Sequence, residues 1–198
     1  EITKGYSRST SPYHNDIHAA DVLQTTYVLT EKGSLYYKCL LTELDYISLM
    51  LSAICHDYKH PGIGNSYIIN SVNSMALTYN DMSPLENFHV SEAFKVILKP
   101  EYYIFKKLNP SEFRLMRRRM IECILSTDMT SHTKNLSALK NKINIYNVKE
   151  GNNVASMIQD KDNSVLFNNQ QVVLNYVIHA ADISNPAKIE FVYKKWVD

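Results

Sequence analysis

The 198-residue chain has few of the residues that build cross-linked proteins. It contains three cysteines, five glycines, six prolines and one tryptophan. Cys39, Cys55 and Cys123 have neither the paired spacing of a thiolate metal site nor the pattern of a disulfide framework. We therefore expect a reduced, cytoplasmic compartment, with the possibility that segments outside this sequence anchor the parent protein to a membrane.

Long apolar runs and a surplus of one charge are also absent. No stretch reaches the roughly 18 consecutive apolar residues of a transmembrane helix, so we expect no membrane contact from this chain. The net charge of +1 provides no basic field for a nucleic acid. With 45% hydrophobic and 21% charged residues, the composition is that of a globular domain. It does not determine an oligomeric state.

A histidine-aspartate pair, His56-Asp57, follows the almost entirely apolar residues 47–55. Ionisable groups at the edge of a core need partners, because burying even an unpaired uncharged polar group costs about 2–7 kcal/mol. A divalent cation is a suitable partner, since imidazole and carboxylate groups bind zinc, manganese or magnesium. The dipeptide alone is weak evidence, so other parts of the chain must supply the remaining ligands.

Two further histidines, His14 and His18, stand one helical turn apart, where we expect a helix to begin near Asp16. Both imidazoles could face one cavity, or both could be ordinary polar residues at a helix start. We expect another helical region over residues 34–57, broken near Leu44, with a buried second part. His60 follows within one turn of its end, and Pro61-Gly62 stops it.

Two helices are predicted in the middle of the chain. Ser83, Pro84 and Glu86 fit the N-cap, N1 and N3 positions of a helix that ends near Leu98. Glu86 therefore has two explanations, a capping-box acid or a carboxylate beside a metal-bound water, and local sequence leaves both open. His89 follows on the same face.

The next predicted helix begins at Pro110 and has an apolar stripe made by Phe113, Met116, Met120, Ile121, Ile124 and Leu125. We expect its arginines to form a solvated face: Arg114, Arg117, Arg118 and Arg119. Residues 133–169 are rich in lysine and asparagine, with loop signals at 151–153 and 160–163. We expect a variable surface excursion there.

Residues 172–182 are nearly all apolar and end with His179 and Asp182. Their β-branched residues allow a strand, but we favour a helix that stops before Pro186. Like residues 47–57, this segment delivers a carboxylate from a buried element. His18, His56, Asp57 and Asp182 could together hold one divalent ion, with Asp57 free to bridge to a second. Two such ions around a shared water suit the hydrolysis of a phosphodiester.

Five groups of residues form an ordered set of motifs: Tyr13-His14-Asn15 with His18, His56-Asp57 with His60-Pro61-Gly62 and Asn65, Tyr79-Asn80-Asp81 with Leu85-Glu86-Asn87, Thr127-Asp128-Met129 with His132, and His179-Ala180-Ala181-Asp182 with Ser184-Asn185-Pro186. The set resembles the catalytic domain of the class I 3',5'-cyclic nucleotide phosphodiesterases, within the HD-domain superfamily of metal phosphohydrolases. The resemblance implies an all-α fold, a compact multi-helix HD-type bundle. It also implies that residues 1–198 are a partial catalytic domain, whose missing C-terminal part carries the residues that hold the base.

The resemblance also implies the role of each site residue. Zinc ligands are expected at His18, His56, Asp57 and Asp182, with Asp57 bridging to magnesium or manganese. His14 is expected to protonate the departing 3'-oxygen. Support for metal-bound waters is expected from His60, Glu86 and Asp128. The nucleotide pocket is expected to include Tyr13, Met129, Ile183 and Asn185. Departures from the family pattern at Lys59 and Phe88 remove no proposed ligand.

The implied function is hydrolysis of cAMP, cGMP or both to the 5'-monophosphate in cyclic nucleotide signalling. Two alternatives remain: a catalytically silent module that binds the cyclic nucleotide, and an HD-superfamily nucleotidase with other substrates. We expect a silent module to lack His14 or a metal ligand, whereas this sequence retains them. A nucleotidase need not carry the motifs at residues 13–15 and 184–186. The sequence does not determine the preference between cAMP and cGMP.

Overall fold

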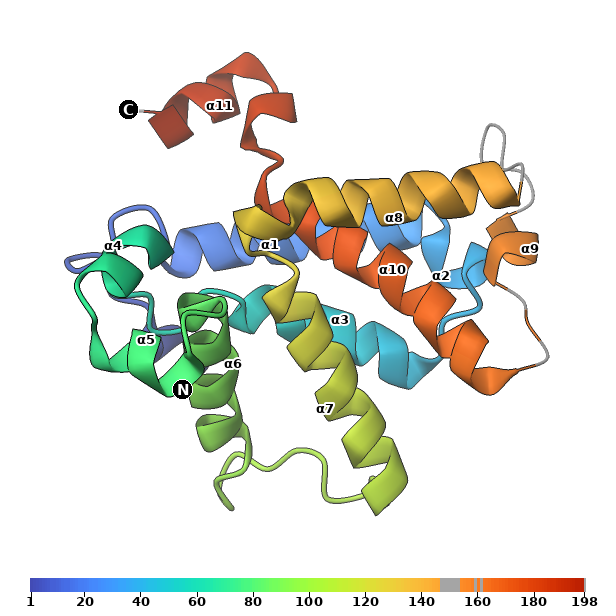
Figure 1. Cartoon of the computed structure of the whole chain (residues 1–198), viewed down its shortest axis with the longest axis horizontal. Helices are drawn as coiled ribbons and strands as arrows, with labels where there is room; N and C mark the ends of the chain where they lie inside the picture. The colour runs from blue at the N-terminus through green and yellow to red at the C-terminus, as the bar shows by residue number, and fades with distance from the viewer. Residues whose placement is uncertain (147–153, 159, 161, 198) are drawn as a thin grey trace.

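The computed structural model describes residues 1–146, 154–158, 160 and 162–197, and these residues form helices with no β-strand among them (Figure 1). The helices in chain order are α1 (Asp16–Tyr27), α2 (Leu35–Lys38), α3 (Glu43–Cys55), α4 (Asn65–Asn70), α5 (Ser74–Tyr79), α6 (Pro84–Ile97), α7 (Pro110–Leu125), α8 (His132–Ile145), α9 (Val154–Ile158), α10 (Asn163–Asp182) and α11 (Glu190–Val197). Short helical turns lie at η1 (Ile2–Gly5), η2 (Val28–Lys32), η3 (Met129–Ser131) and η4 (Asn185–Ala187). The all-α prediction is confirmed. Among the described helices, none has the length and apolar character needed to cross a membrane.

Side-chain caps determine where the central helices begin. The Asn15 side chain accepts hydrogen bonds from the backbone N–H groups of Ile17 and His18, so α1 begins at Asp16 as predicted. Thr42 and Asp45 form a capping box at the start of α3. The helical region predicted over residues 34–57 is therefore interrupted at residues 39–42, slightly before the predicted break.

The third helix lies at the centre of the fold. One side of α3 packs against α1 and the other against α7, while α10 crosses α1, α3 and α7 (Figure 1). One core cluster joins α6, α7 and the end of α3, with Phe94, Met116 and Met120 among its members. A second cluster joins α1, α3 and α10, and includes Val22 and Leu174. The C-terminal end of α3 is thus held between two cores.

The arginine run of α7 is not entirely solvated. Arg114, Arg117 and Arg118 are exposed, as predicted, but Arg119 is only 1% exposed and binds Asp45 of α3. The prediction was wrong for Arg119. The physical reason is the helical period of about 3.6 residues, which places this side chain on the same face as the buried residues three before it and four after it.

The lysine- and asparagine-rich segment is more regular than its loop signals indicate. Helix α8 has no buried residue, but it packs along α10 and places Leu139 and Ile143 against the second core cluster. The predicted loop at 151–153 lies outside the described residues. The helix favoured over residues 172–182 is confirmed, and it begins earlier because Asp162 caps it through the Ser164 N–H.

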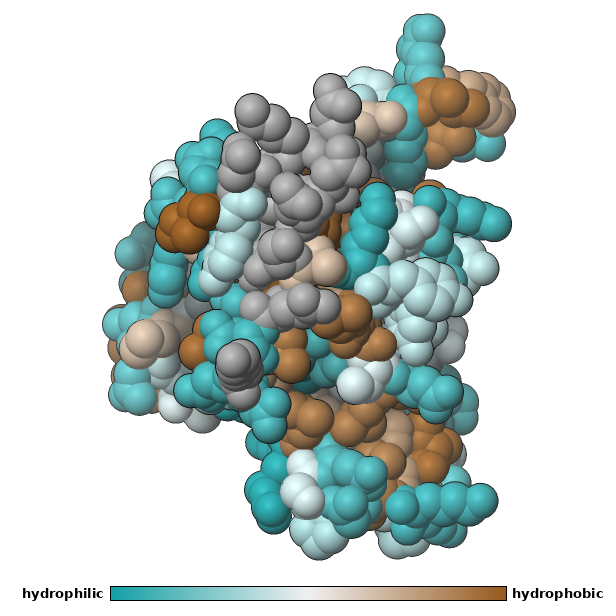
Figure 2. Space-filling view, turned by 90° about the vertical axis from the view of Figure 1, so that its right-hand side faces the viewer, coloured by the Kyte–Doolittle hydropathy of each residue, from teal (hydrophilic) through white to brown (hydrophobic). Residues whose placement is uncertain are grey.

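The last helix projects from the body of the molecule (Figure 1). Figure 2 shows hydrophobic residues on this projecting part, and Phe191 and Val197 of α11 are largely exposed. Trp196 instead turns toward the body, where its ring lies 5.7 Å from that of Tyr13. An ion pair between Lys188 and Asp21 joins the segment before α11 to α1.

Candidate metal centre and active site

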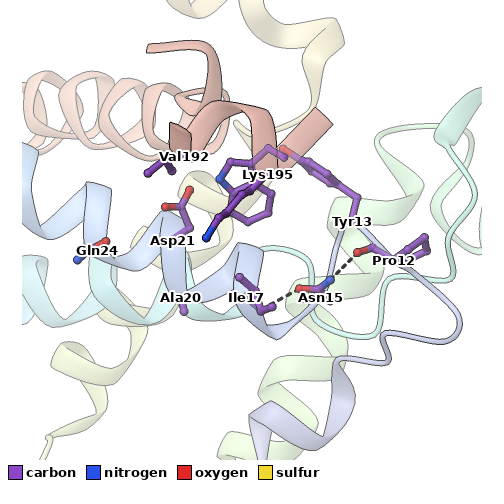
Figure 3. Close-up of a pocket in the computed structure, with 10 residues that line it drawn as sticks. Pro12, Tyr13, Asn15, Ile17, Ala20, Asp21, Gln24, Val192 and Lys195 are labelled. Atoms are coloured by element: carbon purple, nitrogen blue, oxygen red, sulfur yellow. Dashed lines mark hydrogen bonds between the residues drawn. The ribbon is translucent and has the colours of Figure 1, made fainter. Parts of the chain in front are cut away.

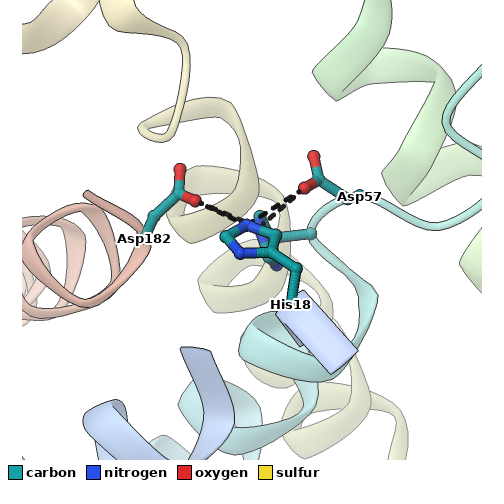
Figure 4. A group of neighbouring side chains, drawn as sticks. His18, Asp57 and Asp182 are labelled. Atoms are coloured by element: carbon teal, nitrogen blue, oxygen red, sulfur yellow. Dashed lines mark hydrogen bonds and ion pairs between the residues drawn. The ribbon is translucent and has the colours of Figure 1, made fainter. Parts of the chain in front are cut away.

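Four side chains from the ends of three helices converge below the surface (Figure 4). His18 belongs to the first turns of α1, His56 caps α3 and is followed by Asp57, and Asp182 is the last residue of α10. Each offers one potential ligand atom, and these four atoms lie within 4.8 Å of one another. Residues separated by more than a hundred positions are thereby brought to one point.

The ligand atoms face one another closely. His18 Nε2 lies 3.0 Å from Asp182 Oδ1, and His56 Nε2 lies 3.0 Å from Asp57 Oδ2. The two Nε2 atoms are 3.3 Å apart. Both histidines are fully buried, whereas the two aspartates retain some exposure. The cluster therefore opens to the outside on its carboxylate side.

Hydrogen bonding on the far side of His56 orients its ring. His56 Nδ1 donates to the carbonyl oxygen of Ala53 at 2.9 Å, so Nε2 of the neutral ring presents a lone pair to the cluster. Burial opposes the charged form of His56, but the carboxylates of Asp57 and Asp182 outweigh it and raise its pKa well above the ordinary value. The cluster thus favours a positive charge between the imidazoles and the carboxylates.

This donor set fits a divalent cation. Two imidazole nitrogens and two carboxylate oxygens are ordinary zinc ligands, and the two negative charges offset those of the ion. Burial raises the pKa of Asp182, but His56 and His18 outweigh this effect and lower it to about 2, so the carboxylate is ionised at neutral pH. Within the described part of the chain, buried His18 Nδ1 has no hydrogen-bond partner.

Asp57 also belongs to a second group of potential metal ligands. Asp57, His60 and His89 offer another set of ligand atoms within 4.8 Å of one another. His89 Nδ1 donates to the carbonyl oxygen of Tyr58 at 2.8 Å, and its Nε2 lies 3.9 Å from Asp57 Oδ1. Since Asp57 Oδ2 faces the first group, the carboxylate has one oxygen toward each group. This is the geometry that a bridging ligand requires.

His60 has a different orientation from the other histidines. Its Nδ1 accepts a hydrogen bond from the Gly62 N–H at 3.0 Å, so the proton of the neutral ring lies on Nε2. That tautomer can donate to a water but offers no Nε2 lone pair to an ion. His60 thus differs from His56 and His89, whose Nδ1 atoms donate to backbone carbonyl oxygens.

His14 lies beside this second group. Its ring stacks on that of His60, with centroids 4.0 Å apart and planes at 16°. Both side chains line a cleft of about 430 Å³ together with Asp57, Glu86 and Asp182. Burial lowers the pKa of His14 below its ordinary value, although Asp57 favours the protonated form. His14 does not belong to the first group of potential ligands, which consists of His18, His56, Asp57 and Asp182.

The capping-box explanation of Glu86 is wrong. Ser83 and Pro84 do take the N-cap and N1 positions of α6, but Ser83 has a left-handed backbone with φ of 43° and makes no side-chain cap bond. Its Oγ instead donates to Asp128 Oδ2 at 2.6 Å. Glu86 Oε2 accepts from Asn65 Nδ2 at 2.9 Å. Burial raises the pKa of Glu86 to about 7.

The predicted nucleotide-pocket residues line different hollows. Met129 lines the 430 Å³ cleft, whereas Tyr13 lines a larger hollow of about 940 Å³ between α1 and α11 (Figure 3). Buried Asn185 is close to Tyr13, because its Nδ2 donates to the Tyr13 hydroxyl at 2.6 Å. Ile183 lines a third hollow, which also includes Thr25 at the end of α1 and Tyr176 of α10. Tyr13 and Asn185 thus meet, while Met129 and Ile183 lie apart.

Comparison with known proteins identifies the family. The model of the 3',5'-cyclic nucleotide phosphodiesterase family matches residues 13–198. The chain belongs to this family. The matched range includes the four residues of the cluster, His18, His56, Asp57 and Asp182.

Two curated phosphodiesterases show how much of the family this chain spans. It is 35% identical over 196 residues to the dual specificity calcium/calmodulin-dependent 3',5'-cyclic nucleotide phosphodiesterase 1 of Drosophila melanogaster, covering 98% of this chain and 21% of that protein. It is 33% identical over 195 residues to the 3',5'-cyclic-AMP phosphodiesterase 4C of Rattus norvegicus, covering 98% of this chain and 34% of that protein. The chain thus spans about a fifth to a third of these relatives.

A solved phosphodiesterase domain has the same fold. The crystal structure of the phosphodiesterase domain of the RhoPDE fusion protein from the choanoflagellate Salpingoeca rosetta matches with a TM-score of 0.84 and 32% sequence identity. The match covers 98% of this chain and 56% of that domain's chain. The helical architecture described above is therefore the phosphodiesterase fold.

Two residues beside the candidate metal centre had no functional role predicted from the sequence. His89 belongs to the second group of ligand atoms, and its spacing of three residues from Glu86 on α6 was the available signal. The sequence predicts Ser83 only as a helix cap, whereas in the structure its hydroxyl bonds Asp128, 45 positions away. No local pattern predicts such a contact.

Proposed function

We propose that this chain forms the metal-binding part of an enzyme that hydrolyses 3',5'-cyclic nucleotides, cAMP, cGMP or both, to 5'-monophosphates. The observation that carries the proposal is the convergence of His18, His56, Asp57 and Asp182 within 4.8 Å, beside a cleft that also contains His14. Family membership and the names of the relatives support the substrate class. When bound, divalent cations lower the pKa of a water and offset the charge of a phosphodiester.

Two sets of residues would hold the two cations. His18, His56, Asp57 and Asp182 would hold zinc, because they combine two imidazoles with two carboxylates. The second oxygen of Asp57 would hold magnesium or manganese, which prefer oxygen ligands. Glu86, Asp128 and His60 would orient waters around that second ion, since each turns a polar side chain into the same cleft.

His14 would deliver the proton that the leaving 3'-oxygen needs. Its position in the cleft leaves it free of the ligand group, and its stacking on His60 fixes the plane of its ring. The hydrogen-bonded pair of Tyr13 and Asn185 would form one wall for the nucleotide. Met129 of η3 would contact the substrate from the 430 Å³ cleft. Ile183 remains a sequence prediction for this pocket.

The test is turnover by the full-length catalytic domain that contains this chain, loaded with zinc and magnesium, because the chain spans only about half or less of the relatives it matches. We expect cAMP or cGMP to yield the 5'-monophosphate, measured by chromatography, and Asp182→Ala to lose tight zinc binding and turnover together. Glu101→Ala, which removes an exposed carboxylate between α6 and α7, is the matched control and should change neither. Nucleotide binding without product would indicate a silent module. Hydrolysis of linear nucleotides alone would indicate a nucleotidase, and either result would contradict the proposal.

A further inference from the structure

A buried arginine of α7 joins α3 and α10, two of the three helices that deliver the candidate metal ligands. Arg119 of α7 donates from Nε to Asp45 Oδ1 of α3 at 2.8 Å. On α10, its Nη2 donates to Gln170 Oε1 at 2.7 Å and its Nη1 to Gln171 Oε1 at 2.9 Å. Nη1 also donates to the carbonyl oxygen of Phe167 at 2.9 Å. One guanidinium therefore contacts α3 and α10 at the same time.

The partners of Arg119 are themselves fixed. Asp45 Oδ2 accepts from the backbone and the hydroxyl of Thr42 in the capping box of α3. Gln170 Nε2 donates to the carbonyl oxygen of Leu40, and Gln171 Nε2 donates to Asn175 Oδ1. Because each of these three side chains makes a second hydrogen bond, a shift of one helix would break several hydrogen bonds together.

The distances along the helices connect this network to the metal centre. Asp45 precedes His56 by 11 residues, and Gln171 precedes Asp182 by the same number. At 1.5 Å per residue, each helix covers about 17 Å between the network and the ligand it delivers. In Figure 1 the C-terminal ends of α3, α7 and α10 approach one another at the centre of the molecule. An axial slip of α10 against α3 would therefore separate His56 and Asp182 by a similar amount.

We propose that Arg119 is a positioning residue for the metal ligands, which acts by fixing the axial register of α10 against α3. This proposal rests on the function proposed above. The apolar contacts between these helices are non-directional, whereas the planar guanidinium fork requires defined positions for its acceptors. A metal site tolerates displacements of only about 0.5 Å. The buried charge thus supplies a register that apolar packing alone leaves loose.

The experiment compares zinc affinity with stability. The double variant Arg119→Met/Asp45→Asn removes both buried charges, so that neither is left unpaired. We expect its zinc dissociation constant, measured by competition with a chelator, to rise about tenfold, the lower end of the effect of losing groups that orient metal ligands. Phe105→Leu, which alters the first core cluster, should lower stability and leave the zinc constant unchanged.

Nuclear magnetic resonance of the metal-free protein supplies a second readout. The ring signals of His18 and His56 report the facing imidazoles, and we expect them to shift in the double variant but not in Phe105→Leu. These spectra test the positioning role even if the wild-type chain binds no zinc. Absence of zinc binding would overturn the proposed function but not the positioning role of Arg119.

If the double variant does not fold, single variants still test the positioning role of Arg119. Gln171→Leu removes one contact from Arg119 to α10, and Arg119→Lys retains the charge beside Asp45 but lacks the fork. We expect both to weaken zinc binding by less than the double variant and to shift the histidine signals in the same direction. Unchanged zinc constants and unchanged histidine spectra in folded variants would show that Arg119 is structural only.

Discussion

Single hydrogen bonds determine which histidine nitrogen is available at the site. The Ala53 carbonyl holds the proton of His56 on Nδ1, the Tyr58 carbonyl does the same for His89, and the Gly62 N–H holds that of neutral His60 on Nε2. Two imidazoles therefore offer Nε2 lone pairs, while the third offers a donor. Identical side chains thus acquire different chemistry from their backbone neighbours.

The role of His14 can be tested at this scale. We expect His14→Ala to lower turnover of cyclic nucleotides by about 10²–10⁴, the usual contribution of a general acid, while zinc content stays at the wild-type level. A nitrophenyl phosphodiester, whose leaving group needs no proton, should be affected much less. His18→Ala is the comparison variant and should lose zinc. Equal loss of zinc in both variants would make His14 a ligand.

Glu86 predicts a pH dependence of stability. Burial raises its pKa from 4.5 to about 7, so between these values the folded state binds more protons than the unfolded state. Stability contributed by this group is therefore present at low pH and lost as the pH rises from about 4.5 toward 7. In chelator, we expect Glu86→Gln to gain stability relative to wild type on going from pH 5 to pH 8.

The amide of Gln can still accept the hydrogen bond from Asn65, so the variant removes the charge and retains the contact. Unfolding in urea at each pH gives the difference between the two proteins, which cancels the titration of other groups. A difference independent of pH would contradict the raised pKa.

At the scale of the helices, each candidate ligand lies at or near a helix end that a local signal defines. Asn15 starts α1 just before His18, and the end of α3 presents His56 and Asp57. A helix end places side chains beyond the apolar core while the body of the helix stays buried. The cluster of candidate ligands can therefore be surrounded by helices and still open to a cleft.

The capping box of α3 provides a prediction about stability. We expect Thr42→Ala to destabilise the fold by about 1 kcal/mol, because Thr42 satisfies the Asp45 N–H at the helix start. Ser131→Ala is the matched control, since Ser131 is the N-cap of α8 but makes no side-chain cap bond. Urea denaturation measures both, and equal effects would show that the cap bond contributes little.

At the scale of the molecule, one tryptophan reports how α11 sits on the body. The ring of Trp196 lies 5.9 Å from that of His18 and 5.7 Å from that of Tyr13, and the ion pair of Lys188 with Asp21 holds the preceding segment. Because the sequence has a single tryptophan, its fluorescence comes from this one position. Zinc added to the metal-free protein should therefore change the emission.

Breaking the Lys188 ion pair should release this helix. We expect Lys188→Ala to shift the Trp196 emission to longer wavelength, since the indole becomes more solvated, and to reduce its response to zinc. Lys194→Ala is the matched control, because Lys194 pairs only with Glu190 inside α11 among the described residues. An identical emission spectrum in Lys188→Ala would show that the ion pair does not hold α11.

The sequence by itself determined several of the helices, among them α1, α3, α6 and α7, and the order of the candidate ligands. Caps at Asn15 and Thr42, the stop at Pro61-Gly62 and the 3.6-residue periodicity are local properties, so they can be recognised within one segment. The ligand types were also evident, because a histidine or carboxylate at the end of an apolar helix is chemically conspicuous. The sequence suggested that these side chains meet only through the number and order of the helix ends that carry a histidine or a carboxylate.

The tertiary structure alone decided which partners these side chains have. Arg119 has the sequence context of a solvated arginine, yet it is buried because Asp45, 74 residues away, and two glutamines of α10 satisfy it. Ser83 has the context of a helix cap, yet it bonds Asp128. The free energy of burying a polar group depends on acceptors supplied by distant segments, and a local pattern carries no information about where those segments lie.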